Sequence, residues 1–103
     1  MQAKSLKALI SEHGVSFDAS TIMNSLLKTG HMENFEYSST TGSGAVKSFK
    51  KLTLAGEQYG LNRSTMHPLK TEPRFFEETF PQMLHVVVEH LRSEVADLHS
   101  LRP

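Results

Sequence analysis

The stretch from Thr79 to Leu101 carries the most regular apolar pattern in the chain. Leucine recurs there every seven residues, and a valine stands four residues after each of the first two leucines. This spacing places an apolar seam along one side of a helix, with Thr79 as its expected N-cap and Pro81 in its first turn. Read as heptads, leucine occupies position d and valine position a, a combination that favours two parallel helices. The predicted seam consists of Leu84, Val87, Val88, Leu91, Val95 and Leu98.

The seam is shorter than three heptads, which is marginal for an isolated coiled coil. The helix is therefore expected to dock on the rest of the chain, to pair with a second copy, or to do both. The chain has 103 residues, which suits one modest core, and a core of that size gains stability from oligomerisation. We therefore expect a homo-oligomer, with a dimer favoured.

The composition excludes several classes of protein. The chain contains no cysteine, so disulfides and thiolate metal sites are excluded and a reducing compartment fits. No apolar run approaches the roughly 20 residues that a membrane-spanning helix needs. The first ten residues lack the apolar segment of a secretory signal. These features predict a cytoplasmic protein that does not enter a membrane.

Charge is balanced overall but unevenly distributed along the chain. The sequence has 11 basic and 11 acidic residues, whereas a dedicated DNA-binding domain is usually basic. Between Lys47 and Lys70 there are five basic residues and one acidic residue, and from Thr71 onward there are six acidic and three basic residues. A basic middle followed by an acidic end suits a small nucleic-acid contact or a charged protein partner.

Two short helices are predicted before the middle of the chain. The spacing of apolar residues indicates a helix over 3–13 that ends at Gly14. Asp18 is the expected N-cap of a second helix over 19–29, which ends at Gly30. Two short helices around a turn of this kind are a helix-turn-helix candidate.

A β-hairpin is predicted next, with strands over 32–38 and 45–52 and a polar turn over 39–44. Thr53 is expected to cap a short helical turn over 54–59, and the segment 61–71 is expected to be irregular. A second short turn is expected over 71–76. Three phenylalanines, at the end of this turn and just after it, are expected to join the last helix to the core as a clasp; they are Phe75, Phe76 and Phe80.

These elements predict an α+β fold. The order of two short helices and a β-hairpin wing is that of a winged-helix domain, and we assign it residues 1–78. Residues 79–103 form the long C-terminal amphipathic helix, a dimerisation or docking element within one compact unit.

Partner-contacting residues are predicted on the second helix and on the hairpin. If the helix-turn-helix bound DNA, the second helix would present short polar side chains that pair with bases or phosphates, and hairpin lysines would contact phosphates. Two aromatic residues on the hairpin are candidates for protein contact. The candidate contacts are Thr21, Asn24, Ser25, Lys28, Phe35, Tyr37, Lys47, Lys50 and Lys51.

No catalytic, cofactor or metal site is predicted. The last helix places His85 four residues before Glu89 and His90 four residues before Glu94, but a zinc site needs three or four converging ligands. Pairs at this spacing on a helix are more often surface ion pairs. The segment 42–44 fits neither a nucleophile elbow nor a phosphate loop. We therefore do not expect an enzyme.

The segment Lys51-Leu-Thr-Leu-Ala-Gly-Glu-Gln-Tyr-Gly-Leu-Asn62, followed by Thr71-Glu-Pro-Arg-Phe-Phe-Glu-Glu-Thr-Phe-Pro-Gln-Met-Leu84, resembles small regulatory proteins of phages and prophages. This group includes C-terminal domains of phage antirepressors, in which a winged-helix-like unit ends in an LT-x-x-G-x-x-(Y/F)-G turn. The resemblance implies an antirepressor that binds a protein repressor and relieves transcriptional repression. The alternative is a winged-helix DNA-binding regulator that uses residues 19–29 and the wing over 39–51.

Overall fold

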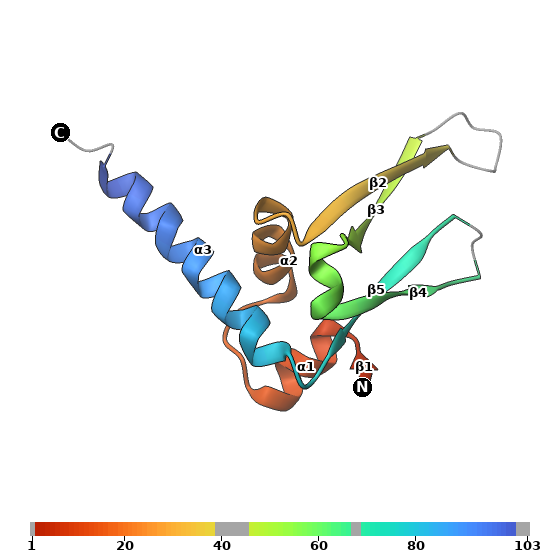
Figure 1. Ribbon diagram of the computed structural model, residues 1–103, viewed down its shortest axis with the longest axis horizontal. Coiled ribbons are helices and arrows are strands. Elements are labelled where there is room, and N and C mark those ends of the chain that lie inside the picture. Colours follow the sequence, from red (N-terminus) through yellow and green to blue (C-terminus); the bar gives the residue numbers. More distant parts are fainter. Residues whose placement is uncertain (1, 39–45, 67–68, 101–103) are drawn as a thin grey trace.

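The computed structural model describes residues 2–38, 46–66 and 69–100 (Figure 1). In these ranges the chain forms three α-helices, a 3-10 turn and two small antiparallel sheets, which confirms the α+β class. One sheet has the strand order β1-β5-β4, and the other is the hairpin β2-β3. The elements are β1 (Ala3–Lys4), α1 (Leu6–His13), α2 (Ala19–Lys28), β2 (Met32–Ser38), β3 (Val46–Leu52), η1 (Ala55–Gln58), β4 (Gly60–Ser64), β5 (Thr71–Phe76) and α3 (Phe80–Ser100).

The two short helices end where their capping residues predict. Gly14 adopts a left-handed conformation with φ of 62° after α1, and Gly30 has φ of 83° shortly after α2. Asp18 caps α2, and its Oδ1 accepts a hydrogen bond of 2.7 Å from the backbone N–H of Thr21. Hydrogen bonding by the Thr21 side chain, followed by this backbone bond, holds the pKa of Asp18 below its usual value, because both stabilise the carboxylate.

The first helix starts later than predicted. Ser5 is its N-cap and accepts a hydrogen bond of 3.2 Å from the N–H of Ala8. The predicted helical residues Ala3–Lys4 instead form strand β1 and pair with Phe76 and Phe75 of β5. A two-residue strand gains its hydrogen bonds from a distant partner, so the local sequence pattern does not indicate it.

The predicted β2-β3 hairpin is confirmed, with a register that runs from Met32 opposite Leu52 to Ser38 opposite Val46. Its predicted turn over 39–44 lies outside the described residues. Side chains alternate between the two faces of this ribbon, and Met32 and Leu52 lie in the core at its base.

The predicted irregular structure over 61–71 is wrong in its first part, because strand β4 forms there. The predicted turn over 71–76 is also wrong, because these residues form strand β5. These strands pair from Gly60 opposite Phe75 to Ser64 opposite Thr71. Pro73 is tolerated because β1 reaches only the end of β5, which leaves β4 as the single neighbouring strand at that position.

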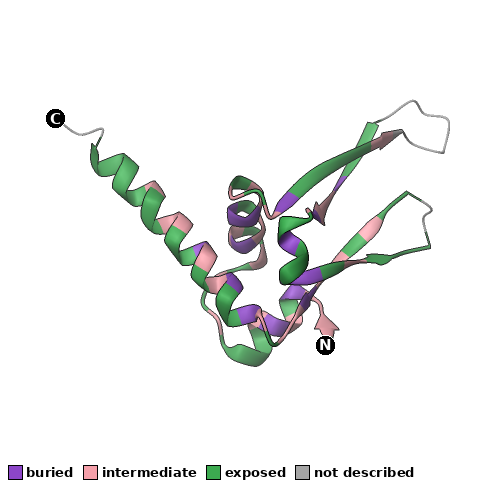
Figure 2. Cartoon of the chain, viewed as in Figure 1, coloured by how far each residue is buried: buried purple, intermediate pink, exposed green. Residues whose placement is uncertain are grey.

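The core lies where the helices meet the bases of both hairpins, as the buried segments in Figure 2 show. The first half of α3 contributes Phe80, Met83 and Val87 to it. Phe75 and Phe80 are almost fully buried, which confirms their role as a clasp, whereas Phe76 is half-buried. The core residues are Leu6, Leu9, Ile22, Leu26, Met32, Leu52, Tyr59, Phe75, Phe80, Met83 and Val87.

The long helix α3 extends well past this core. The described chain measures 52 × 37 × 23 Å, and α3 and the hairpins project from the core in different directions (Figure 1). Thr79 precedes the helix as predicted, but its buried Oγ1 has no hydrogen-bond partner among the described residues, so its predicted capping bond is not formed. Within the described ranges, no helix has the length and apolar character needed to cross a membrane.

Candidate functional site

The predicted seam of α3 is divided between the core and the surface. Val87 is fully buried in the core of its own chain, and Leu84 and Leu91 pack partly against that core. The remaining seam residues are exposed: Val88 to 37%, Val95 to 54% and Leu98 to 62%. The prediction that Val87 lies in an intermolecular seam is therefore wrong, because α2 and the sheets cover that side of the helix.

The exposed part of the seam borders a groove of about 440 Å³. Its wall on α3 follows a helical spacing of three and four residues, so the groove runs along the helix axis. Phe17, from the connector between α1 and α2, closes one side of it. The lining residues are Phe17, Val88, Leu91, Arg92, Val95, Ala96 and His99.

The role of Phe17 in lining the groove could not be predicted from the sequence. Nothing in the local sequence shows that the connector after α1 lies beside a helix that starts more than sixty residues later. The face of a single helix is convex, so α3 alone cannot form a groove. The groove exists because the Phe17 side chain lies beside α3 and provides a second wall. The structure thus turns an apolar stripe into a concave surface of the kind that receives protruding side chains.

The predicted reading face of α2 lies against α3. Thr21, Asn24, Ser25 and Lys28 line a small cleft of about 180 Å³ whose other wall belongs to α3. Ser25 is only 2% exposed, so its predicted outward position is wrong. It faces inward because α3 covers this side of α2.

An ion pair fastens the two helices across that cleft. The Nζ of Lys28 donates a hydrogen bond of 2.8 Å to Oε2 of Glu94 on α3. This bond is the main cause that holds the pKa of Glu94 below its usual value. The Nε2 of His90 lies 3.4 Å from the same Glu94 oxygen, so the predicted i, i+4 pair is formed and faces α2.

The aromatic residues predicted on the hairpin lie on one face of its ribbon, together with Lys47 and Lys51. The Phe35 and Phe49 rings are 5.4 Å apart, the Tyr37 and Phe49 rings are 5.7 Å apart, and the Lys51 ammonium lies 4.5 Å from the centre of the Phe35 ring. Lys47 is opposite Tyr37 on the same face, whereas Lys50 is opposite Asn34 on the other face.

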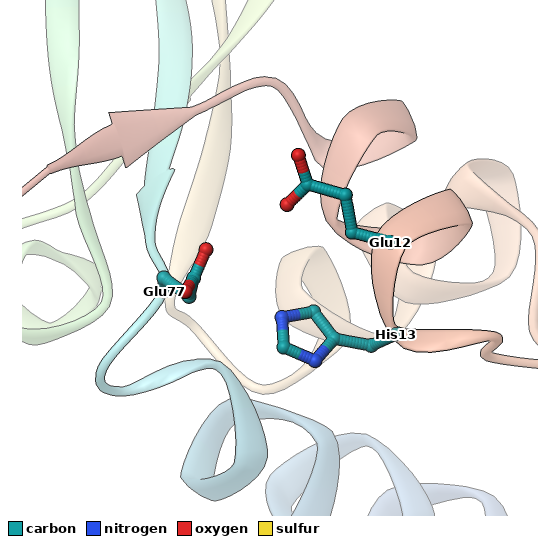
Figure 3. A group of neighbouring side chains, drawn as sticks. All are labelled: Glu12, His13 and Glu77. Atoms are coloured by element: carbon teal, nitrogen blue, oxygen red, sulfur yellow. The ribbon is translucent and has the colours of Figure 1, made fainter.

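One side-chain cluster has the composition of a metal site. Ligand atoms of Glu12, His13 and Glu77 all lie within 4.8 Å of one another, at the end of α1 and the start of the segment before α3 (Figure 3). The Lys4 ammonium, however, lies 2.9 Å from Glu12 Oε2 and 2.7 Å from Glu77 Oε2. We interpret the cluster as an ion-pair network, because the Lys4 ammonium already pairs with both carboxylates.

That network shifts the protonation of its members. The hydrogen bond to Glu77, followed by that to Glu12, raises the pKa of Lys4 above its usual value. The same bond from Lys4 lowers the pKa of Glu77. Both shifts favour the charged forms, so the network ties β1 and α1 to the connection between β5 and α3 over a wide pH range.

The motif that resembles phage regulators joins the two sheets. Asn62 is the last residue of the first segment: its Nδ2 donates a hydrogen bond of 3.0 Å to the Leu52 carbonyl, and its Oδ1 accepts one of 2.8 Å from the Leu52 N–H. Thr53 donates a side-chain hydrogen bond of 2.7 Å to the Gly30 carbonyl. The motif residues thus have structural roles at the base of both hairpins.

No protein-family model matches the chain, and neither the curated proteins nor the solved structures contain a significant match.

Proposed function

We propose that this chain is a regulator that acts by binding other protein chains along the distal half of α3. The observation that supports this most is the groove between Phe17 and the exposed seam residues Val88 and Val95. An exposed apolar groove at the surface of a small domain is typical of a protein-binding site, because leaving such a surface in water is unfavourable.

The target that we propose is a transcriptional repressor, as the resemblance of the segment 52–60 to phage antirepressors implies. We further propose that α1, α2 and the β2-β3 hairpin correspond to the winged-helix-like unit of that group. A helix of the repressor would lie in the groove, in the manner of other amphipathic helices that bind grooves through apolar residues on successive turns. The bound repressor would then be held away from its operator.

The same groove suits a second copy of the chain. Leucine and valine alternate along the exposed seam in the order that favours two helices, and Leu98 extends the seam beyond the region that α2 covers. We propose that the free protein is a homodimer joined through α3, and that a repressor competes with the second copy for this surface. Because the seam is short, the dimer would be weak enough to exchange.

The alternative function, sequence-specific DNA binding through α2, receives less support. Thr21, Ser25 and Lys28 face α3, and Glu94 already binds the Lys28 ammonium. For α2 to enter a groove of DNA, α3 would have to leave its present position.

An operator-release assay tests the proposal. A candidate repressor is bound to a fluorescent operator duplex, and the chain is added while the fluorescence anisotropy is measured. We expect the wild type to release the duplex, and Val95→Glu to fail, because a carboxylate in an apolar contact costs at least about 2 kcal/mol, or roughly thirtyfold in Kd.

Ser93→Glu is the matched control, because it adds the same charge to the exposed polar side of the same helix. It should release the duplex as the wild type does. Release by Val95→Glu at wild-type concentrations would contradict the proposed binding surface.

A further inference from the structure

The unpaired cations of the described chain gather on its two hairpins. Five cationic side chains lie within 4 Å of a carboxylate, namely Lys4, Lys28, Lys51, Arg74 and Arg92. Among the other described lysines and arginines, only Lys7 lies on a helix. The rest belong to the hairpins or to the segment that joins β4 to β5: Lys47, Lys50, Arg63 and Lys70.

Both hairpins project from the core on the side away from α3, as two prongs (Figure 1). The two hydrogen bonds between Asn62 and Leu52 join them at their bases, so their directions are fixed relative to each other. The second prong is the hairpin that sequence periodicity does not reveal. It adds Arg63 and Lys70 to the lysines of the first prong.

Most carboxylates on the prongs are already neutralised. Glu33 lies 3.5 Å from Lys51, and Glu72 lies 3.2 Å from Arg74. Among the described carboxylates of the prongs, Glu36 on β2 alone has no ion pair. The free charge of the prongs is therefore positive, although the chain as a whole is neutral.

The unpaired lysines of β3 lie on both faces of the β2-β3 ribbon, so they suit a polyanion whose phosphates flank the ribbon on both sides. Lys47 and Lys50 are three residues apart on β3, so they lie on opposite faces of the β2-β3 ribbon. A two-stranded ribbon fits the major groove of DNA, where phosphates line both walls. The aromatic rings of the ribbon pack on one another, with Phe49 only 9% exposed, while Phe35 stays 39% exposed beside the Lys51 ammonium.

We infer that the two hairpins form a basic clamp that binds the phosphate backbone of duplex DNA through Lys47, Lys50, Arg63 and Lys70, independently of α2. This activity goes beyond the proposed protein binding, since it uses the opposite side of the molecule.

The inference is tested with a fluorescent 20-bp duplex of arbitrary sequence, by measuring anisotropy between about 20 and 200 mM salt. Four phosphate contacts predict a slope of log K against log salt of about −3.6, and Lys47→Ala/Lys50→Ala should reduce its magnitude to about 1.8. Arg63→Ala/Lys70→Ala should have the same effect. Because these side chains form no ion pairs with other described residues, the thermal unfolding midpoint should not change.

Control variants outside the prongs show whether binding depends on the clamp residues. Lys7→Ala removes an unpaired cation outside the prongs, and Asn24→Ala alters the exposed part of α2; both should bind DNA as the wild type does. Val95→Glu should also bind DNA normally, so failure of the α3 proposal and failure of the clamp are distinguishable.

Four results would overturn the inference. They are an absence of binding at 20 mM salt, an equal loss of affinity in Lys7→Ala, a loss in Asn24→Ala, and equal binding to polyglutamate, which would indicate an acidic protein partner instead.

Discussion

At the scale of single residues, two glycines allow the backbone of the motif to touch its neighbours. A Cβ on Gly56 would lie 1.9 Å from the His31 carbonyl oxygen, and a Cβ on Gly60 would lie 2.1 Å from that of Arg74. Neither distance can be relieved by rotating a side chain, because the obstructing atoms belong to the backbone. The glycines of the LT-x-x-G-x-x-Y-G pattern are therefore explained by close packing between the base of one hairpin and its surroundings.

Gly60→Ala is accordingly expected to destabilise the fold by about 3 kcal/mol or more, since the backbone itself must shift. Urea unfolding followed by circular dichroism measures the effect. Gly14→Ala is the matched control: its Cβ meets no atom within 4 Å, and only the left-handed φ of 62° is unfavourable, at a cost of about 1 kcal/mol. Equal losses of stability in the two variants would contradict the role of close packing at Gly60.

The Lys4 network predicts a dependence of stability on pH. The pKa of Glu77 is lowered in the folded chain, so its contribution is present above about pH 4.5 and is lost as the pH falls through the folded pKa. The pKa of Lys4 is raised, so its contribution is present below about pH 10.5 and is lost as the pH rises through the folded pKa.

Lys4→Met should therefore lower the urea midpoint between pH 5 and 10, and the difference from the wild type should shrink below pH 4. Lys7→Met is the control, because Lys7 is exposed without an ion pair. A difference from the wild type that is the same at pH 3 and pH 7 would show that the network does not act through charge.

At the scale of elements, α3 has two halves with different environments. Its first half is held by Phe80, Met83 and Val87 in the core, and its second half contacts the rest of the described chain through Leu91 and the Lys28–Glu94 pair. The heptad pattern identifies the apolar residues correctly but does not reveal which of them meet the chain's own core. That division depends on where α2 and the connector at Phe17 lie relative to α3 in the folded chain.

Elements that are determined locally could be predicted from sequence. Asp18 and Gly14 mark helix ends because capping involves only neighbouring residues. Strands β4 and β5 escaped prediction because each is short and is stabilised by pairing with the other, and Asn62 and Pro73 resemble loop residues when read alone. The basic clamp and the α3 groove were predicted only in part: Lys47, Lys50 and the apolar seam were identified from sequence. Arg63, Lys70 and Phe17 were not, because their placement depends on contacts between distant segments.

At the scale of the whole molecule, charge and apolar surface are separated along its length. Apart from Lys7, the unpaired cations of the described residues lie on the prongs, whereas the distal half of α3 carries an apolar groove. Glu89 and Glu94 of that helix are paired with Arg92 and Lys28. A chain with a net charge of zero therefore has two different surfaces, one cationic and one apolar. This arrangement suits an adaptor that binds a protein at one end and a polyanion at the other.

The central claim is that the exposed half of α3 binds a protein chain, and self-association tests it most directly. Sedimentation equilibrium of the wild type at about 100 μM should give a mass near twice the 11.5 kDa of one chain. Ser93→Glu should give the same mass, and Val95→Glu should give the mass of one chain. A wild type that remains monomeric at this concentration, or a Val95→Glu variant that remains dimeric, would contradict the account.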